Sequence, residues 1–368
     1  MLGGGFLAYT SSNYVWQNLP FKQPLYSLAE SVEGSPVFLL QRATRYGPKE
    51  VEVRRLVAEV SEHLAGSETE HYLEVMSGGD HPASTNDLGE FADTPPKQPL
   101  QLLFIHHSCG GQLLATPGSD EGTNCIYRSH PNGGGLRARL EQNRYVVHEA
   151  SYNSRIGQNT DIFDWLPKFR NEMERVLACD FQDHSYSDGR RNQIVVFKPC
   201  FPNNDFRSEG SPPGDPNGPE LTVWNAKAAY TAVLDEFKKR PEVLFVCVTA
   251  PPLAPKNGAQ PLWKRMAKTL LGRNDNLTTN AHNLMTSAPL AREFNNWLAS
   301  PDGWLRNSDT TNVAVFDYYD ILTDHGKSDL SQYSTGRGYD SHPSRVGNEK
   351  AAEAFVPFLN RAVRRAGL

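Results

Sequence analysis

Two short segments carry residues that together could perform nucleophilic catalysis. Ser108 follows the largely apolar run Leu100–His106, and His342 lies in the segment Asp340-Ser-His-Pro near the end of the chain. A serine hydroxyl becomes a nucleophile when an imidazole accepts its proton and a carboxylate orients that imidazole. The residue types predict Ser108 as nucleophile, His342 as general base and Asp340 as orienting acid. Each segment alone is also typical of an ordinary turn, so the hypothesis requires that they meet in space.

Two further segments could supply N–H donors for the oxyanion that forms when an ester carbonyl is attacked. Gly157 follows the segment Arg144–Ala150, and Asn203 and Asn204 follow Asn192–Lys198. Backbone N–H groups and side-chain amides are the donors that stabilise such an oxyanion. Pro-Asn-Asn-Asp is equally a good turn sequence, and many glycines are required by turns, so a structural role stays open for each.

For these residues to meet, the segments between them must form a parallel sheet. Strand-sized apolar segments alternate five times with helical patterns, which predicts a doubly wound α/β sheet with helices on both faces. Ligands bind such sheets at the carboxyl ends of the strands. The expected strands are Leu100–His106, Arg144–Ala150, Asn192–Lys198, Val243–Thr249 and Val313–Tyr318, and the expected helices are Leu136–Asn143, Trp165–Leu177, Leu221–Arg240, Ala288–Ala299 and Gly347–Ala366.

The order of these segments resembles the SGNH (GDSL-like) hydrolase family, whose members carry Ser, Gly, Asn and His in four blocks. The likeness is greatest to a bacterial subgroup whose first block, Ile-His-His-Ser, stands here at Ile105–Ser108. The other blocks resemble residues 156–162, 197–203 and 340–348. The resemblance covers about residues 100–366 and implies a flavodoxin-like three-layer α/β/α sandwich with a five-stranded parallel sheet.

The resemblance implies catalysis by Ser108, His342 and Asp340. It also implies an oxyanion hole made by the N–H groups of Ser108 and Gly157 and the amide of Asn203. Asn204 is the alternative third donor, because the general family pattern Gly-x-Asn-Asp would match it instead.

Two departures from the general family pattern affect these roles. The usual Gly-Asp-Ser is missing from the first block. The usual acid stands three positions before the histidine, where this chain has Tyr339, while Asp340 stands only two before. The alternatives for orienting His342 are a backbone carbonyl or one of the aspartates after the fifth strand, which are Asp317, Asp320 and Asp324.

The activity implied by the resemblance is hydrolysis of a carboxylic ester through an acyl-enzyme, without a cofactor. The segments Gln112–Asn132 and Asn204–Glu220 are expected to be polar loops, which favour a small ester or an acetylated carbohydrate over a lipid chain. Candidate substrate-binding residues are His107, Tyr152 and Phe201, whereas Trp165 and Trp224 fall on expected helices and suit the core. The alternatives are a polysaccharide O-acetyltransferase and a catalytically degenerate binding module on the same fold.

Neither the histidines nor the cysteines predict a metal site. His106 and His107 would point to opposite faces of a strand, and no Cys-x-x-Cys pair is present. The five cysteines are too few and too scattered for a disulfide framework. In the sheet order of the family the first and third strands are neighbours, so Cys109 and Cys200 are expected to lie close together, as a disulfide or as a buried thiol pair.

Composition excludes two classes of protein. The net charge of -5 lacks the basic excess that a sequence-independent nucleic-acid binder needs. No apolar run reaches the roughly 18–20 residues of a membrane span, so any membrane link would be a trimmed anchor at Met1–Tyr9, which reads equally well as a plain terminus.

The first 98 residues differ in character from the rest. A helical pattern at Tyr46–Gly66 is followed by the polar segment Ser67–Pro99, which predicts a partly helical N-terminal extension and linker at 1–98 and a hydrolase domain at 99–368. The resemblance favours a bacterial protein, either exported or cytoplasmic, and neither the oligomeric state nor the role of the extension follows from the sequence.

Overall fold

The computed structural model describes residues 88–256 and 277–368, with only the backbone described over 277–283. The segment Met1–Tyr9, the helical pattern Tyr46–Gly66 and most of the predicted extension 1–98 lie outside these residues.

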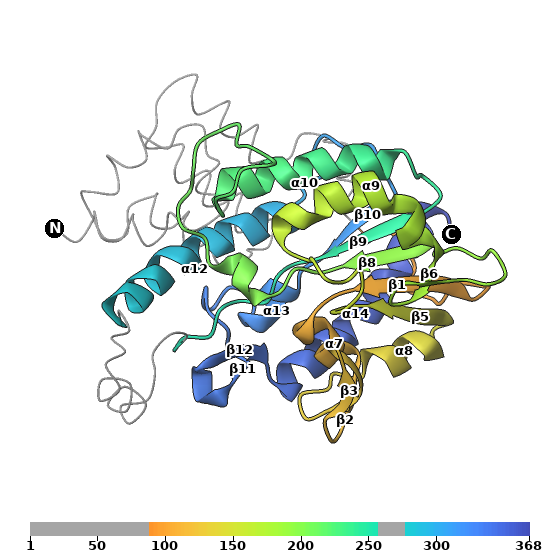
Figure 1. The fold of residues 1–368 in the computed structure, drawn as a ribbon, viewed down its shortest axis with the longest axis horizontal. Coiled ribbons are helices and arrows are strands. Elements are labelled where there is room, and N and C mark those ends of the chain that lie inside the picture. The colour runs from red at the N-terminus through yellow and green to blue at the C-terminus, as the bar shows by residue number, and fades with distance from the viewer. Residues whose placement is uncertain (1–87, 257–276) are drawn as a thin grey trace, which may run out of the picture. The chain divides into compact units, whose positions relative to one another are not determined.

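The described residues form an α/β fold around one parallel sheet of five strands (Figure 1). The strand order is β10-β9-β8-β1-β5, and every neighbouring pair is parallel. The predicted five-stranded parallel sheet is therefore confirmed, with each strand within the expected range. The strands are β1 (Leu100–Ile105), β5 (Tyr145–Ala150), β8 (Ile194–Phe197), β9 (Leu244–Val248) and β10 (Val313–Phe316).

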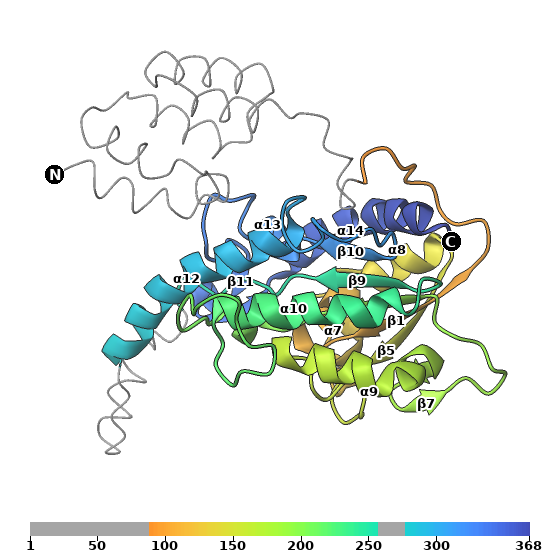
Figure 2. The same cartoon turned by 90° about the horizontal axis from the view of Figure 1, so that it is seen from above.

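Helices cover both faces of the sheet, which gives three layers (Figures 1 and 2). One face carries α9 (Trp165–Ala178), α10 (Val223–Lys238) and α12 (Leu277–Ala299). The other carries α7 (Ser108–Leu114), α8 (Leu136–Gln142), α13 (Tyr318–Leu322) and α14 (Arg345–Ala366).

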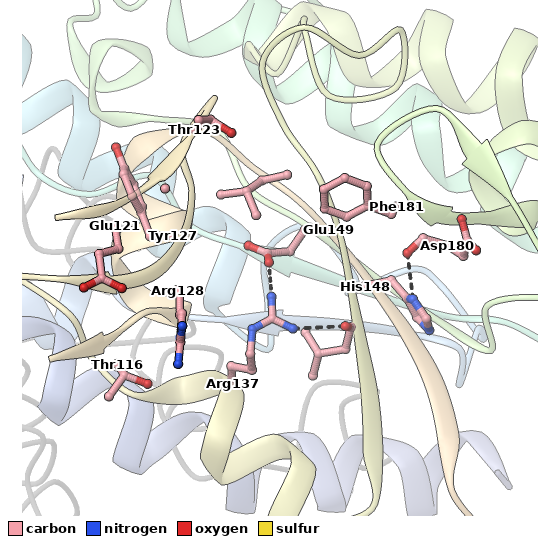
Figure 3. A pocket seen from close by; sticks show the side chains of 13 residues that line it. Thr116, Glu121, Thr123, Tyr127, Arg128, Arg137, His148, Glu149, Asp180 and Phe181 are labelled. Carbon is pink, nitrogen blue, oxygen red and sulfur yellow. Dashed lines mark hydrogen bonds and ion pairs between the residues drawn. The ribbon is translucent and has the colours of Figure 1, made fainter. Parts of the chain in front are cut away.

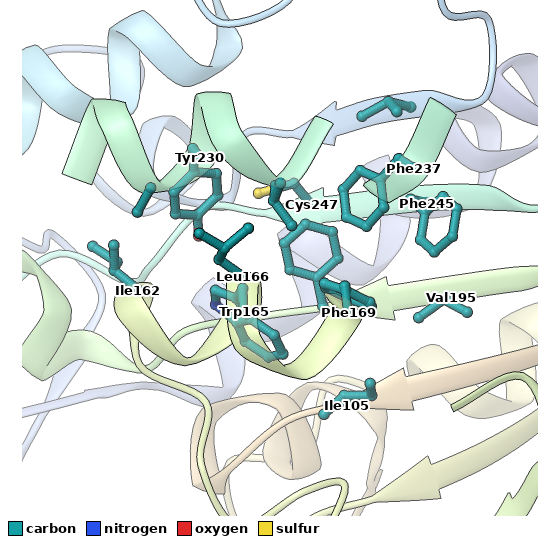
Figure 4. Close-up of a cluster of buried hydrophobic side chains, with 14 of the residues drawn as sticks. Ile105, Ile162, Trp165, Leu166, Phe169, Val195, Tyr230, Phe237, Phe245 and Cys247 are labelled. Atoms are coloured by element: carbon teal, nitrogen blue, oxygen red, sulfur yellow. The ribbon is translucent and has the colours of Figure 1, made fainter. Parts of the chain in front are cut away.

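Alternation along the strands divides the core between the two faces. Ile105 and Phe197 point toward α9 and α10, while Phe104 and Val196 point toward α14. All four residues of β8 are buried, as expected for a parallel strand covered on both sides. Figure 4 shows the cluster beneath α9 and α10, where the rings of Phe237 and Phe245 stack at 4.0 Å.

The helix α7 is absent from the expectations, because two glycines in its sequence Ser-Cys-Gly-Gly disfavour a helix. Packing explains why they are present. A Cβ at Gly110 would lie 2.4 Å from Cβ of His106, and one at Gly111 would lie 1.8 Å from the carbonyl oxygen of Cys125. The glycines therefore let α7 pack closely against His106, at the end of β1, and against the backbone of Cys125.

Several short elements surround the main sheet. The segment Gln112–Asn132, expected to be a polar loop, instead contains the end of α7 and a small three-stranded sheet. That sheet consists of β2 (Thr116–Pro117), β3 (Glu121–Thr123) and β4 (Ile126–His130); the two other pairs are β6 (Cys179–Phe181) with β7 (His184–Ser185) and β11 (Ser334–Thr335) with β12 (Asp340–Pro343). The 3-10 turns are η1 (Ile162–Asp164), η2 (Phe201–Asn204) and η3 (Gly336–Gly338).

The segment just before residue 99 is bound to the α/β fold. The Asn360 amide donates to the carbonyl of Asp93 at 2.6 Å, and the Arg144 guanidinium donates to the carbonyl of Lys97 at 2.7 Å. By its contacts the α/β unit begins at Thr85. Among the described residues, no helix combines the length and apolar character needed to span a bilayer.

Candidate active site

Ser108, His342 and Asp340 form one chain of hydrogen bonds at the carboxyl end of β1. Ser108 is the first residue of α7, and its Oγ lies 2.8 Å from Nε2 of His342. The Nδ1–H of His342 donates to Oδ1 of Asp340 at 2.7 Å. The serine can therefore pass its proton to Nε2 while the carboxylate holds the ring, which is the geometry of an activated nucleophile.

The position of Asp340, two residues before the histidine, follows from local structure. Both residues lie on β12, and residues two apart on a strand point to the same side. The backbone N–H of His342 also donates to Oδ1 of Asp340, at 3.0 Å. Partial burial opposes ionisation of the carboxyl, yet these two hydrogen bonds from His342 lower the pKa of Asp340 below its usual value.

The three alternative acids are engaged elsewhere. Asp317 accepts hydrogen bonds from Thr249 and from the backbone N–H of Asp320 at the start of α13. Asp320 pairs with Arg292 and His325, and Asp324 pairs with Lys327. Each of them thus holds the α13 region together rather than orienting His342.

His107 connects the nucleophile to the loop that carries Gly157. Its Nε2 donates to the carbonyl of Gly157 at 2.8 Å, and its ring stacks on Tyr152 with centroids 3.7 Å apart. Burial lowers the pKa of His107. The candidate substrate-binding residues His107 and Tyr152 therefore form one aromatic pair next to Ser108.

Gly157 is a glycine for a steric reason. A Cβ there would lie 2.2 Å from the backbone nitrogen of Ser151, so the two backbone segments could not approach. Its N–H donates to the hydroxyl of Ser154 at 2.9 Å. The expected oxyanion donor is thus already hydrogen-bonded within its own loop.

Asn203 and Asn204 have different surroundings. The amide nitrogen of Asn203 donates to Asp161 at 2.8 Å and more weakly to the carbonyl of Cys200 at 3.2 Å. The amide nitrogen of Asn204 donates to the carbonyls of Ala250 and Pro251, and its oxygen accepts from Asn295 of α12. Asn204 therefore links β9 to α12, and Asn203 is the one bonded to the segment around Cys200.

Phe201 contacts the imidazole of His342, and His130 lies near enough for the charges of the two histidines to interact. The ring of Phe201 meets the ring of His342 edge-on at 5.1 Å. Burial lowers the pKa of His130, and the charge of His342 acts in the same direction. The sequence analysis missed His130, because nothing in its own segment distinguishes it from a surface residue.

Comparisons of this chain with protein-family models, with curated proteins and with solved structures found no match. The site's chemistry therefore has to be argued from its own geometry.

A buried charged network lies beneath the site and was also missed. His106 is fully buried, and its Nε2 lies 2.9 Å from Oε1 of Glu149, whose other oxygen pairs with Arg137. Burial lowers the pKa of His106 to about 3, so the ring stays neutral. A glutamate inside a predicted strand of the parallel sheet is the signal that could have revealed this network, because a buried carboxylate needs a partner.

His106 and His107 follow the end of β1 and are not adjacent strand residues as predicted, and their Nε2 atoms bond different segments, at Glu149 and at Gly157. Among the residues that the structure describes, no group of three or more His, Cys, Asp or Glu side chains is placed to hold a metal ion.

A pocket of about 610 Å³ lies between β5 and the small sheet of β2, β3 and β4 (Figure 3). Tyr127 and Phe181 line it, together with Arg137 and Glu149 of the buried network. Neither Ser108 nor His342 belongs to its lining, so it is separate from the hydrogen-bonded chain of the candidate active site.

Proposed function

We propose that this chain is a serine ester hydrolase of the SGNH (GDSL-like) type. The observation that carries the proposal is the continuous chain from Ser108 Oγ through His342 to Asp340, with links of 2.8 and 2.7 Å. A parallel sheet with the order seen here and a serine at the end of β1 agree with it.

In the proposed reaction Ser108 Oγ attacks the ester carbonyl while Nε2 of His342 takes the hydroxyl proton. The imidazolium is held by Asp340 and returns the proton to the leaving alcohol, and water then hydrolyses the acyl-enzyme by the same route. The reaction needs no cofactor.

The first oxyanion donor is the N–H of Ser108. As the first residue of α7, Ser108 has no carbonyl of its own helix to bond. Asn203 becomes the second donor when its longer bond, 3.2 Å to the Cys200 carbonyl, gives way to the oxyanion. Gly157 would contribute only after its N–H leaves Ser154.

We propose a short acyl group, with an acetylated carbohydrate as the substrate class. The His107–Tyr152 stack and Phe201 surround the nucleophile with aromatic faces, and sugars bind such faces. A degenerate binding module is the weaker alternative, because loss of function would leave no reason for three side chains to stay aligned. An acetyltransferase would use the same acyl-enzyme with a sugar hydroxyl as acceptor.

The test combines covalent labelling with ester hydrolysis. We expect a fluorophosphonate to modify Ser108 and p-nitrophenyl acetate to be hydrolysed faster than longer esters, and both reactions to be lost in Ser108→Ala. Ser187→Ala, at an exposed serine, is the matched control and should behave like the wild type. Labelling without hydrolysis would indicate the transferase, and a serine that does not label would overturn the proposal.

A further inference from the structure

Two thiols lie together directly behind the candidate nucleophile. The Sγ atoms of Cys109 and Cys200 are 3.4 Å apart, and Cys200 Sγ is 3.8 Å from Ser108 Oγ. Cys109 is fully buried and Cys200 nearly so, and both are free thiols. The pair is the one expected from the neighbouring positions of β1 and β8, in its reduced form.

The two sulfurs are chemically unequal. The hydrogen bond between the two sulfurs lowers the pKa of Cys200, and the charge of the buried Lys198 acts in the same direction. Burial raises the pKa of Cys109. Cys200, next to the nucleophile, is thus the sulfur with thiolate character, and the thiolate is the form that reacts with oxidants.

The other three cysteines have different partners. Cys125 accepts from Tyr127, Cys179 donates to the Gln182 carbonyl, and Cys247 is buried in the core beneath α10. Among the described cysteines, the contact between Cys109 and Cys200 is therefore the one that places two sulfurs within reach of a bond.

We infer that Cys109 and Cys200 are an oxidation site that a hydroperoxide converts to a disulfide, and that this disulfide switches off the Ser108 centre. The second half of the inference rests on the proposed esterase function; the first half does not.

The chemistry balances with one hydroperoxide. The Cys200 thiolate attacks the terminal oxygen of the peroxide and breaks the O–O bond, which gives a sulfenic acid and, after protonation, one water or alcohol. The Cys109 sulfur then attacks the Cys200 sulfur, the S–O bond breaks, and the Cys109 proton leaves with the hydroxide as water. The two thiols are oxidised by two electrons and the peroxide is reduced by two.

Formation of the Cys109–Cys200 disulfide would displace Ser108, because Ser108 is joined to Cys109 by a peptide bond. The sulfurs must approach from 3.4 Å to about 2.0 Å. Cys109 follows Ser108 in the first turn of α7, where Gly110 and Gly111 leave no space for the helix to shift freely. Cys200 precedes η2, and its carbonyl accepts from Asn203. Both the nucleophile and a proposed oxyanion donor are therefore attached to the moving atoms.

The experiment uses the full chain, first reduced and then freed of reductant, and exposed to hydrogen peroxide. In the wild type we expect a mass loss of two hydrogens, a peptide linking Cys109 to Cys200, and a fall in acetate ester hydrolysis of about 10²-fold, the size typical of a displaced catalytic group. Dithiothreitol should restore both mass and activity. The matched variant Cys125→Ser should respond like the wild type, whereas Cys109→Ser and Cys109→Ala should form no internal disulfide.

The two halves of the inference fail in distinguishable ways. Five free thiols in the oxidised wild type would overturn the oxidation site. A mapped disulfide with unchanged ester hydrolysis would overturn the switch. If Ser108 fails to label even in the reduced protein, the proposed function fails, while the mass measurement still decides whether the disulfide forms.

Discussion

At the scale of single residues, the acid of the candidate triad is explained by strand geometry. A carboxylate two positions before a histidine reaches its Nδ1 when both lie on an extended strand, as Asp340 and His342 do on β12. The departure from the general family spacing is thus compatible with the same chemistry.

Asp340→Asn tests that role. We expect the ester hydrolysis rate to fall by about 10²–10⁴-fold, because an amide can neither accept from Nδ1–H with equal strength nor stabilise the imidazolium. Since the pKa of Asp340 is lowered, the wild-type carboxylate is ionised at neutral and mildly acidic pH, so a loss should be seen throughout about pH 5 to about pH 8. A variant with wild-type rates would mean that a backbone carbonyl suffices.

Substitutions of Asn203 and Asn204 should have different effects, one on the rate of ester hydrolysis and the other on the stability of the fold. Asn203→Ala is expected to lower kcat by about 10²–10³-fold, as loss of an oxyanion donor does. Asn204→Ala should instead cost about 1–3 kcal/mol of unfolding free energy, because the carbonyls of Ala250 and Pro251 lose their donor inside the protein. Kinetics and thermal melts of both variants check this, and the reverse pattern would make Asn204 the donor.

The sequence was sufficient to predict that Ser108, His342 and Asp340 meet, but not to predict the hydrogen-bond partners of the proposed oxyanion donors. Ser108, His342 and Asp340 stand out because their chemistry requires one another. That Gly157 bonds Ser154 and Asn203 bonds Asp161 depends on loop conformations, which no residue type specifies.

At the scale of elements, the main helices were predictable from their helical periodicity and the main strands from their short apolar runs. The helix α7 was not, because its glycines serve packing against His106 and Cys125 rather than helix propensity. The pairs β6–β7 and β11–β12 were also missed, since their strands are short and mostly polar and form no apolar run.

Asp317, the residue just before α13, makes the stability of this element depend on pH. Burial, and then the nearby charge of Asp320, raise the pKa of Asp317 to about 6. A raised carboxyl pKa means that ionisation is harder in the folded state, so this group lowers stability as pH rises from about 4 to about 7.

Asp317→Asn keeps an oxygen for Thr249 and for the Asp320 N–H while removing the charge. Because part of Asp317 is exposed, we expect the variant to gain about 1–2 kcal/mol over the wild type at about pH 7.5 and nothing at about pH 4. Denaturant unfolding at both values measures this, and an equal effect at both would contradict it.

At the scale of the molecule, one sheet edge gathers residues that are distant in sequence. Ser108 and His342 are 234 positions apart, yet they meet because β1 ends beside β12, the short strand before α14. The hydrogen-bonded chain and both hydrophobic clusters lie within the unit Thr85–Leu368. The architecture of this unit could be predicted from the alternation of strands and helices alone. What residues 1–84 contribute to the protein could not be predicted from the sequence.

Removal of residues 1–84 tests whether they are needed for folding or for ester hydrolysis. We expect the fragment Thr85–Leu368 to fold cooperatively and to hydrolyse acetate esters within about threefold of the full chain, because a unit with its own core can fold alone. Circular dichroism melting and kinetics of both proteins make the comparison. A folded but inactive fragment would show that residues 1–84 complete the site.

The proposed base and acid, His342 and Asp340, both lie on β12, while the proposed nucleophile Ser108 belongs to another part of the chain. The alignment of His342 with Asp340 is thus set by one short stretch of backbone that lies outside the five-stranded sheet. A shift of β12 relative to the five-stranded sheet would therefore change the distance from His342 to Ser108 more than the distance from His342 to Asp340. We therefore expect that Asp340–Pro343, transferred as one segment beside a serine on a different scaffold, would keep the hydrogen bond between Asp340 and His342.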